Sequence, residues 1–352
     1  MNLAQINTEY FCGIDLHKNT MYVCIMNRAG KISLHQNMPC SFETFLLRVE
    51  PWYRRMAVGV EAMYSYYWLY DACVDAGIPF YLGHPYYMKS IHGGKKKNDR
   101  IDSKKIADLM RANHLPIGYP YPKEMRPTRD LLRRRHRLVR IRSECYTHIQ
   151  NTFSQNGVLD VDHSSVKAKK TRRELMQRFD DAELQSTIET DLDLIDFCDP
   201  KIRKLEIQIL NKAKHHNRRD LNILLSIPGV GETLALIIIY EVHTIDRFPT
   251  VQNFSSYARL VKCDRSSAGK KSGGSGNQKI GNPYLKWAFS EIITKAKITS
   301  PVIAKFYQRL QSKFGPARAR SIIAHRFGVA VYFMLKNGTA FDEHLFVKTN
   351  MK

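Results

Sequence analysis

The sequence predicts an α/β domain at its amino end and mainly helical regions after it. Up to about residue 115, short apolar runs alternate with segments of helical periodicity, which is typical of a layered sheet rather than a helix bundle. Beyond that point the apolar residues recur at helical spacing, with Pro-rich and Gly-rich segments between the helices. We therefore expect an α/β domain, a helical connector and a mainly α carboxy-terminal domain.

The predicted strands of the first domain are short apolar runs. The run at 56–60 is continuous, as in a strand buried on both faces, and the turn at 27–30 separates two runs as a hairpin would. Strands are expected at 10–15, 21–26, 31–36, 56–60 and 79–82, and helices at 42–49, 66–76 and 102–112. Four prolines in 116–127 interrupt periodicity and predict a linker, so the first domain is expected to span 1–125.

The middle of the chain is expected to form a basic coiled-coil connector over 126–216. A helix over 128–153 carries many arginines and one apolar seam, in which Leu131, Leu138 and Cys145 recur every seven residues. A second helical pattern covers 201–214 and is suited to pair with the first. The residues between these two helices, about 155–200, fit no element clearly.

The third region, 217–352, is expected to be mainly helical. It opens with two apolar helices around the turn Pro228-Gly229-Val230-Gly231, a pattern similar to a helix-hairpin-helix. The two glycines would expose backbone N–H groups to a phosphate, although a plain helix–helix turn fits equally well. A loop rich in Ser, Gly and Lys follows over 264–281.

The charge balance points to a polyphosphate partner. The 352 residues hold 55 Lys and Arg against 33 Asp and Glu, a net charge of +22, which a small-molecule enzyme does not need. A merely soluble basic protein is the alternative. The residues expected to bind nucleic acid are Arg129, Arg133, Arg134, Arg137, Arg140, Gly229, Gly231, Lys270, Lys271 and Lys279.

Other sequence features bound the class of protein. None of the seven cysteines forms a CxxC pair, so a zinc knuckle is unsupported. The amino end has no apolar signal core, and no stretch approaches the ~18–20 apolar residues of a membrane span. We therefore expect a cytoplasmic protein without a membrane partner.

Four carboxylates are candidate metal ligands. Asp15 and Glu61 each end an apolar strand, and Asp99 and Asp102 open a helix on one face, with Cβ atoms ~5–6 Å apart. Clustered carboxylates need cations, and hard oxygen ligands select Mg²⁺, with Mn²⁺ as the substitute. Two such ions ~3.5–4 Å apart can clamp both oxygens of a phosphoryl displacement. Taken alone, Asp99 and Asp102 fit a simple helix cap better than a catalytic site, and the four carboxylates in this order are the more specific signal.

The loop Arg265-Ser266-Ser267-Ala268-Gly269-Lys270 brings hydroxyls beside basic residues. A serine there would act as a nucleophile only if a base or metal activates it, and a flexible basic loop without catalysis is the alternative.

With these residues in place, the chain resembles the DEDD-type transposases of insertion-sequence family one-hundred-ten, which include Piv-like DNA invertases and bridge-RNA-guided recombinases. The resemblance rests on the motifs Gly13-Ile-Asp15, Val60-Glu61-Ala62, Asn98-Asp-Arg-Ile-Asp102-Ser103, Leu225-Ser-Ile-Pro-Gly-Val-Gly231, Ser267-Ala-Gly-Lys270 and Lys279-Ile-Gly-Asn282. These motifs occur in order from about residue 10 to about 295.

The resemblance implies a RuvC-like, RNase H-type fold for 1–125 and a Mg²⁺ site made of Asp15, Glu61, Asp99 and Asp102. It also implies that Ser267 attacks DNA and forms a phosphoserine link, with Ser266 as a neighbour that leaves the register open. Donor and target DNA, a structured guide RNA, a dimer that assembles to a tetramer, and a prokaryotic nucleoid setting follow from it. A RuvC-like nuclease that cuts branched nucleic acid without rejoining it is the alternative function.

Overall fold

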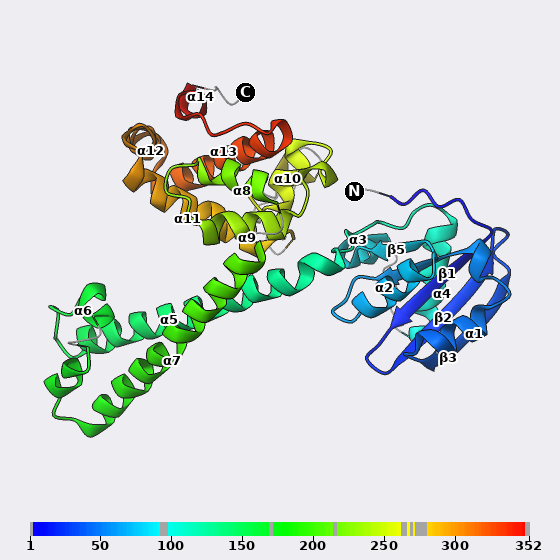
Figure 1. The fold of residues 1–352 in the computed structure, drawn as a ribbon, viewed down its shortest axis with the longest axis horizontal. Helices are drawn as coiled ribbons and strands as arrows, with labels where there is room; N and C mark the ends of the chain where they lie inside the picture. Colours follow the sequence, from blue (N-terminus) through cyan, green and yellow to red (C-terminus); the bar gives the residue numbers. More distant parts are fainter. Residues whose placement is uncertain are drawn as a thin grey trace. The chain divides into compact units, whose positions relative to one another are not determined.

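The computed structural model describes residues 3–91, 98–168, 172–213, 217–261, 266–267, 270–271 and 280–348. Residue contacts divide the chain into two compact units, Met1–Glu124 and Met125–Lys352 (Figure 1). No helix in these described segments is long and apolar enough to cross a membrane. The expected three-part division, with a boundary between 216 and 217, stays a prediction, because the second unit contains both helical regions.

The first unit is built on a mixed five-stranded sheet in the order β3-β2-β1-β4-β5. Its strands are β1 (Tyr10–Leu16), β2 (Thr20–Asn27), β3 (Ile32–Pro39), β4 (Met56–Glu61) and β5 (Phe80–Gly83). The first three form an antiparallel meander, whereas β4 and β5 run parallel to β1. All five lie within a few residues of the predicted runs, so this α/β prediction is confirmed.

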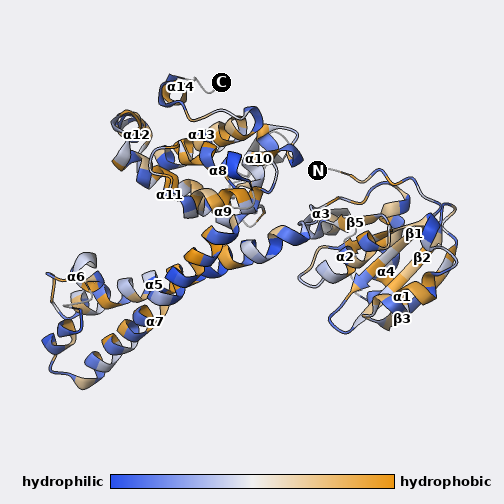
Figure 2. Ribbon diagram, in the orientation of Figure 1, coloured by the Kyte–Doolittle hydropathy of each residue, from blue (hydrophilic) through white to orange (hydrophobic). Residues whose placement is uncertain are grey.

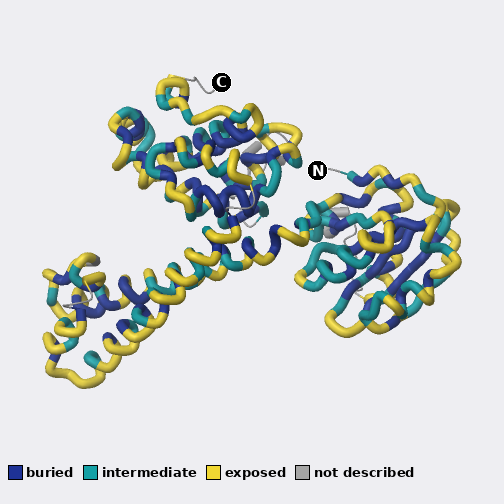
Figure 3. Tube along the Cα trace, in the orientation of Figure 1, coloured by how far each residue is buried: buried dark blue, intermediate teal, exposed yellow. Residues whose placement is uncertain are grey.

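Helices cover both faces of the sheet and make a three-layered core. Helices α1 (Phe42–Val49) and α2 (Tyr67–Asp75) pack on one face, around Ile14, Val58 and Phe45. Helix α4 (Asp99–Arg111) packs on the other face, around Phe11, Ala57 and Met110. Figure 3 shows β1, β2 and β4 as largely buried between these layers, whereas β3 is mostly exposed or half-buried. The remaining elements of this unit are η1 (Tyr53–Arg55), α3 (Pro85–Ile91) and η2 (Lys123–Met125).

Two long antiparallel helices begin the second unit. Helix α5 (Arg126–Gln155) packs against α7 (Ala182–Ala213) through a core that includes Ile149, Phe153 and Leu192. The predicted pairing is therefore present, but α7 starts earlier than the predicted 201 and contains Pro200 within it. Between them lie α6 (His163–Lys167) and η3 (Glu174–Arg178), so much of the segment that fitted no element is helical.

The rest of the second unit is a helical cluster, as predicted. It contains α8 (Arg218–Leu225), α9 (Glu232–Val242), η4 (Ile245–Arg247), α10 (Val251–Tyr257), α11 (Pro283–Thr299), α12 (Pro301–Phe314), α13 (Pro316–Asn337) and α14 (Glu343–Lys348). Helix α9 is buried and hydrophobic along most of its length (Figure 2), because its sequence includes the run Leu234–Tyr240. Two short strands, β6 (Ser266–Ser267) and β7 (Lys270–Lys271), form a separate antiparallel pair.

Candidate metal centre and nucleic-acid interface

Asp15 and Glu61 lie side by side at one edge of the sheet. Strands β1 and β4 run parallel, with Gly13 opposite Gly59 and Ile14 opposite Val60. Asp15 follows Ile14, and Glu61 follows Val60, directly after the last of these pairs. Because the carboxyl ends of parallel neighbours meet at the same edge, the register brings the two acidic residues together, as expected from their positions at strand ends.

Helix α4 reaches this edge because the strands beneath it carry glycines. A Cβ at Gly13 would lie 2.2 Å from the carbonyl oxygen of Ser103, and one at Gly59 would lie 2.3 Å from Met110 Sδ. Side chains alternate between faces along a strand, so Asp15 shares the face of Gly13. The glycines therefore let α4 lie against the sheet on the face where Asp15 projects.

The first turn of α4 supplies the other two acidic residues. Asn98 caps the helix by accepting a hydrogen bond from the Arg100 amide at 3.0 Å, and Asp99 and Asp102 follow in the first turn. Asp102 forms an ion pair with Lys105, its Oδ1 lying 3.1 Å from Nζ. Because Asn98 already caps the helix, the simple cap role considered for Asp99 and Asp102 is filled by another residue, and both carboxylates lie in the first turn.

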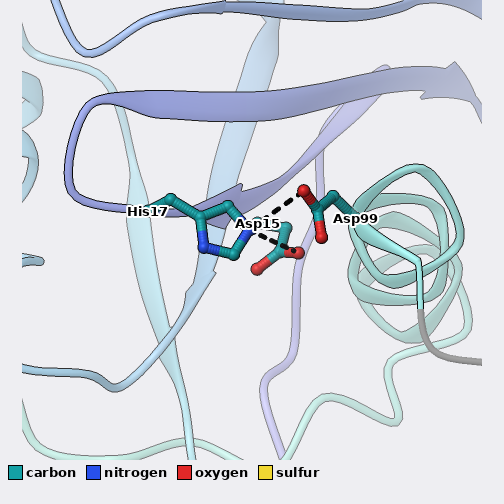
Figure 4. Close-up of side chains that lie close together, drawn as sticks. All are labelled: Asp15, His17 and Asp99. Carbon is teal, nitrogen blue, oxygen red and sulfur yellow. Dashed lines mark ion pairs between the residues drawn. The ribbon is translucent and has the colours of Figure 1, made fainter.

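A histidine that we did not predict lies within the acidic cluster. His17 Nε2 is 3.5 Å from Asp15 Oδ2 and 3.2 Å from Asp99 Oδ2, and Figure 4 shows the ring reaching both carboxylates. One possible ligand atom from each of these three residues lies within 4.8 Å of the others. His17 follows Asp15 by two positions at the end of β1, the spacing that places side chains on one face, and this spacing was the available signal.

The electrostatics at Asp15 match a site that needs a cation. Burial raises the pKa of Asp15, His17 lowers it, and the negative charges of Asp99, Asp102 and Glu61 raise it further, so that the net shift is upward. The charges of the other three predicted carboxylates therefore all act on Asp15. Among the described residues, Asp15 and Asp99 are the two predicted carboxylates whose oxygens lie close enough, together with His17, to share one ion. Asp102 instead forms its ion pair with Lys105.

Strand β3, at the end of the sheet beyond β2, holds the first turn of α4 in place through His35. His35 Nε2 lies 2.8 Å from the carbonyl oxygen of Arg100, and the hydroxyl of buried Ser103 lies 3.4 Å from the same nitrogen. Burial is the main cause that lowers the pKa of His35, although the bond to Arg100 opposes it. A neutral His35 ring that donates to Arg100 fits this geometry.

Helix α5 presents only part of its arginine set to solvent. Arg134, Arg137 and Arg140 are exposed, and Arg140 also contacts Glu144 at 3.1 Å. In contrast, Arg129 and Arg133 bind Glu241 of α9 at 2.8 and 2.7 Å. Both arginines are thus engaged inside the second unit by a carboxylate more than 100 positions away in sequence, and their contact with nucleic acid stays a prediction.

The two turn glycines differ in their surroundings. Gly229 has a φ of +77°, and a Cβ there would lie 2.7 Å from Lys295 of α11, so close packing explains this glycine without a ligand. Gly231 is the N-cap of α9, has no side chain to cap the helix, and would meet nothing within 4 Å. An open helix start at Gly231 remains compatible with phosphate binding.

Within the predicted serine loop, from 264 to 279, the structure describes four residues, Ser266, Ser267, Lys270 and Lys271. Strands β6 and β7 place Ser267 opposite Lys270, and Ser266 opposite Lys271, in an antiparallel pair. Lys279 and the rest of the predicted loop up to 279 lie outside the described residues.

Two family models match the chain. Residues 12–156 match a model described as Transposase, for the DEDD transposases of IS110 elements, and residues 221–308 match a model described as Transposase IS116/IS110/IS902 family. A comparison with curated proteins found no match. The first matched region contains all four predicted carboxylates, and the second contains the predicted serine.

Proposed function

Because this chain belongs to the IS110 family of transposases, we propose that it cuts and rejoins DNA strands with a divalent metal at Asp15, Glu61, Asp99 and Asp102 and with Ser267 as the nucleophile. The observation that carries the metal part is the meeting of Asp15 and Asp99 at one sheet edge. The order β3-β2-β1-β4-β5, an antiparallel meander with two parallel strands, supports a RuvC-like, RNase H-type fold.

The donor set fits Mg²⁺, with Mn²⁺ as the substitute. Four carboxylates supply the hard oxygen ligands that these ions prefer. Burial is the main cause that raises the pKa of Asp15, and the nearby negative charges of Asp99, Asp102 and Glu61, which a cation would offset, raise it further. A bound ion would polarise the scissile phosphate and stabilise the departing oxygen. His17 adds a nitrogen beside the same oxygens, and we assign it to hold Asp15 and Asp99 in position.

Ser267 is proposed to attack a backbone phosphorus. Its Oγ forms a new P–O bond, one DNA oxygen leaves the phosphorus and takes up a proton, and the hydroxyl proton passes to a base or to solvent. The resulting phosphoserine ester conserves the phosphodiester energy, so a hydroxyl of a second DNA strand can reverse the step and rejoin. The pairing of Ser267 with Lys270 supports this choice, because it brings a cationic residue to the same short hairpin.

Binding and assembly complete the proposal. Donor and target DNA, and a structured guide RNA, are proposed to contact Arg134, Arg137 and Arg140 and the loop lysines Lys270, Lys271 and Lys279, with the helix-hairpin-helix start at Gly231 as a phosphate site. A dimer that assembles to a tetramer would let one subunit supply the serine and another the metal site. The setting would be the cytoplasm of a prokaryotic cell, on the nucleoid.

Two variants test the chemistry directly. Asp15→Asn should abolish cleavage in Mg²⁺ while DNA binding persists, because phosphate contacts come from arginine and lysine. In stalled reactions the wild type should carry DNA covalently on the protein, Ser267→Ala should lose this adduct, and Ser266→Ala should keep it. Loss of the adduct only in Ser266→Ala would move the nucleophile by one residue. Cleavage with no adduct in the wild type would replace this proposal with the water-dependent nuclease.

A further inference from the structure

A buried carboxylate outside the metal centre receives an unusual set of donors. Glu241, on α9, has a side chain only 3% exposed. Its two oxygens accept four hydrogen bonds from α5, at 3.0 and 2.8 Å from Arg129 and at 2.7 and 3.0 Å from Arg133. Burial alone would raise the pKa of Glu241, but these bonds and charges lower it overall. Glu241 is therefore ionised and fixed to one face of α5.

A fifth donor to Glu241 is Asn282, which lies 41 positions later in the sequence. The Asn282 amide nitrogen Nδ2 donates to Glu241 Oε2 at 2.7 Å, and Asn282 is itself buried. Its Oδ1 accepts from the amides of Tyr284 and Leu285 at 2.9 and 3.2 Å and so caps α11. The Oδ1 atom of Asn282 thus caps α11, and its Nδ2 atom binds Glu241.

Asn282 also closes the base of the segment that carries Ser267. Its backbone N–H donates to the carbonyl oxygen of Tyr257 at 2.6 Å, and Arg259 Nε donates to the carbonyl oxygen of Gly281 at 3.0 Å. Gly281 has a φ of +92°, and a Cβ there would lie 2.6 Å from the Tyr257 oxygen. The two ends of the segment between α10 and α11 are therefore joined where Asn282 meets Glu241.

From these contacts we infer that Glu241 and Asn282 are positioning residues for the serine chemistry: they fix the base of the Ser267 segment to helix α5. This inference rests on the proposed function of Ser267. The same helix presents Arg134 and Arg137 to solvent, next to Arg133. Nucleic acid that binds this basic face is thereby held by the element that also anchors the base of the nucleophile's segment.

The link is tested by replacing Asn282 with serine. A serine hydroxyl still accepts from the first amides of α11 and keeps the cap, but it has no amide to donate to Glu241. Asn217→Ser is the matched control, because Asn217 caps α8 by accepting from the Asp220 amide at 3.0 Å and has no contact with Glu241 among the described bonds. Both variants replace an asparagine cap by a serine cap, and only Asn282→Ser loses the hydrogen bond to Glu241.

The measurement is the rate of covalent adduct formation against DNA concentration, with the full-length chain and Mg²⁺. We expect Asn282→Ser to lower the maximal rate about tenfold, with the half-saturating DNA concentration and the melting temperature unchanged from Asn217→Ser. A merely structural role would instead lower the melting temperature or weaken DNA binding. If Asn282→Ser does not fold, Tyr257→Phe, which removes the hydroxyl 3.3 Å from Asn282 Nδ2, should show the same selective loss of rate.

Two results would overturn the inference and can be told apart. If Asn282→Ser forms the adduct at the rate of Asn217→Ser, the link does not position Ser267, and the proposed function stands. If neither the wild type nor Asn217→Ser forms any adduct through Ser267, the proposed function falls, and this inference falls with it.

Discussion

Replacing Gly13 by alanine should both destabilise the first unit and remove metal-dependent strand cleavage. The added Cβ would lie 2.2 Å from the Ser103 carbonyl oxygen and 2.4 Å from the Ala107 amide nitrogen. Both atoms belong to the backbone of α4, so no side-chain rotation relieves the overlap. The helix must move away from β1 by about 1 Å before the atoms reach ordinary contact distance.

The size of the effect follows from this displacement. Overpacking a core costs about 1–3 kcal/mol, and an overlap with helix backbone places Gly13→Ala near the upper end. For a unit of this length, a loss of about 3 kcal/mol lowers the melting temperature by about 10 °C. The same shift moves Asp99 and Asp102 away from Asp15, and a misplacement of about 1 Å can lower a catalytic rate about 100-fold.

Gly118→Ala provides the matched control for Gly13→Ala. Gly118 belongs to the same unit, and a Cβ there would make ordinary contacts with Leu82 at 3.6 Å. Melting is followed by circular dichroism and cleavage by gel, with each variant at the same Mg²⁺ concentration. If Gly13→Ala melts and cleaves like Gly118→Ala, α4 does not rest on β1 as the structure has it, and the argument for the metal centre is wrong.

Three further perturbations test separate parts of the molecule. Mg²⁺ at a hundred times its Kd should stabilise the wild type by about 2.7 kcal/mol, and Asp99→Asn should lose most of this stabilisation. If Mg²⁺ stabilises both proteins equally in a thermal shift assay, Asp99 is not a metal ligand. Burial raises the pKa of Glu241, but its two arginines lower it more, so its stabilisation is full above the ordinary carboxyl pKa of about 4.3 and declines as the pH falls below it. The melting-temperature difference between wild type and Glu241→Gln should therefore shrink with acidification, and a constant difference from pH 7 to pH 3 would contradict the lowered pKa. Arg134→Gln and Arg137→Gln should each reduce the slope of log affinity against log salt by up to about 0.9. Arg129→Gln should leave the slope unchanged and cost about 1.5–3 kcal/mol of stability, because Arg133 and Asn282 still bind Glu241. Filter binding across salt concentrations measures the slopes, and an equal slope change in Arg129→Gln would place Arg129 in the DNA interface.

Local pattern was sufficient to predict the sheet and its acidic edge. Asp15 and Glu61 were recognisable because each ends an apolar run, and the strand character of such runs depends on neighbouring residues alone. The pairing of β1 with β4, and the glycines that admit α4, depend on contacts between distant segments. His17 was missed although it follows Asp15 by two positions, because its second partner, Asp99, reaches it only from α4.

The arginines of helix α5 could be found from the sequence, but their individual partners could not. Its composition predicted a nucleic-acid surface, and the exposed Arg134 and Arg137 remain consistent with one. Arg129 and Arg133 have the same side chain on the same helix, yet both form ion pairs with Glu241 of α9. No local pattern distinguishes an arginine that faces solvent from one that meets a carboxylate more than 100 positions later.

The hydrogen-bonded base of the serine segment has a consequence for how such chains can diversify. Tyr257 and Asn282 stand 25 positions apart in the sequence, and their contact fixes both ends of the intervening segment. A residue inserted or deleted next to Gly281 or Asn282 would displace this contact and the bond from Asn282 to Glu241 together. The register of the chain at this point is therefore shared by α9, α10 and α11, and a change of length there would be felt in all three helices at once.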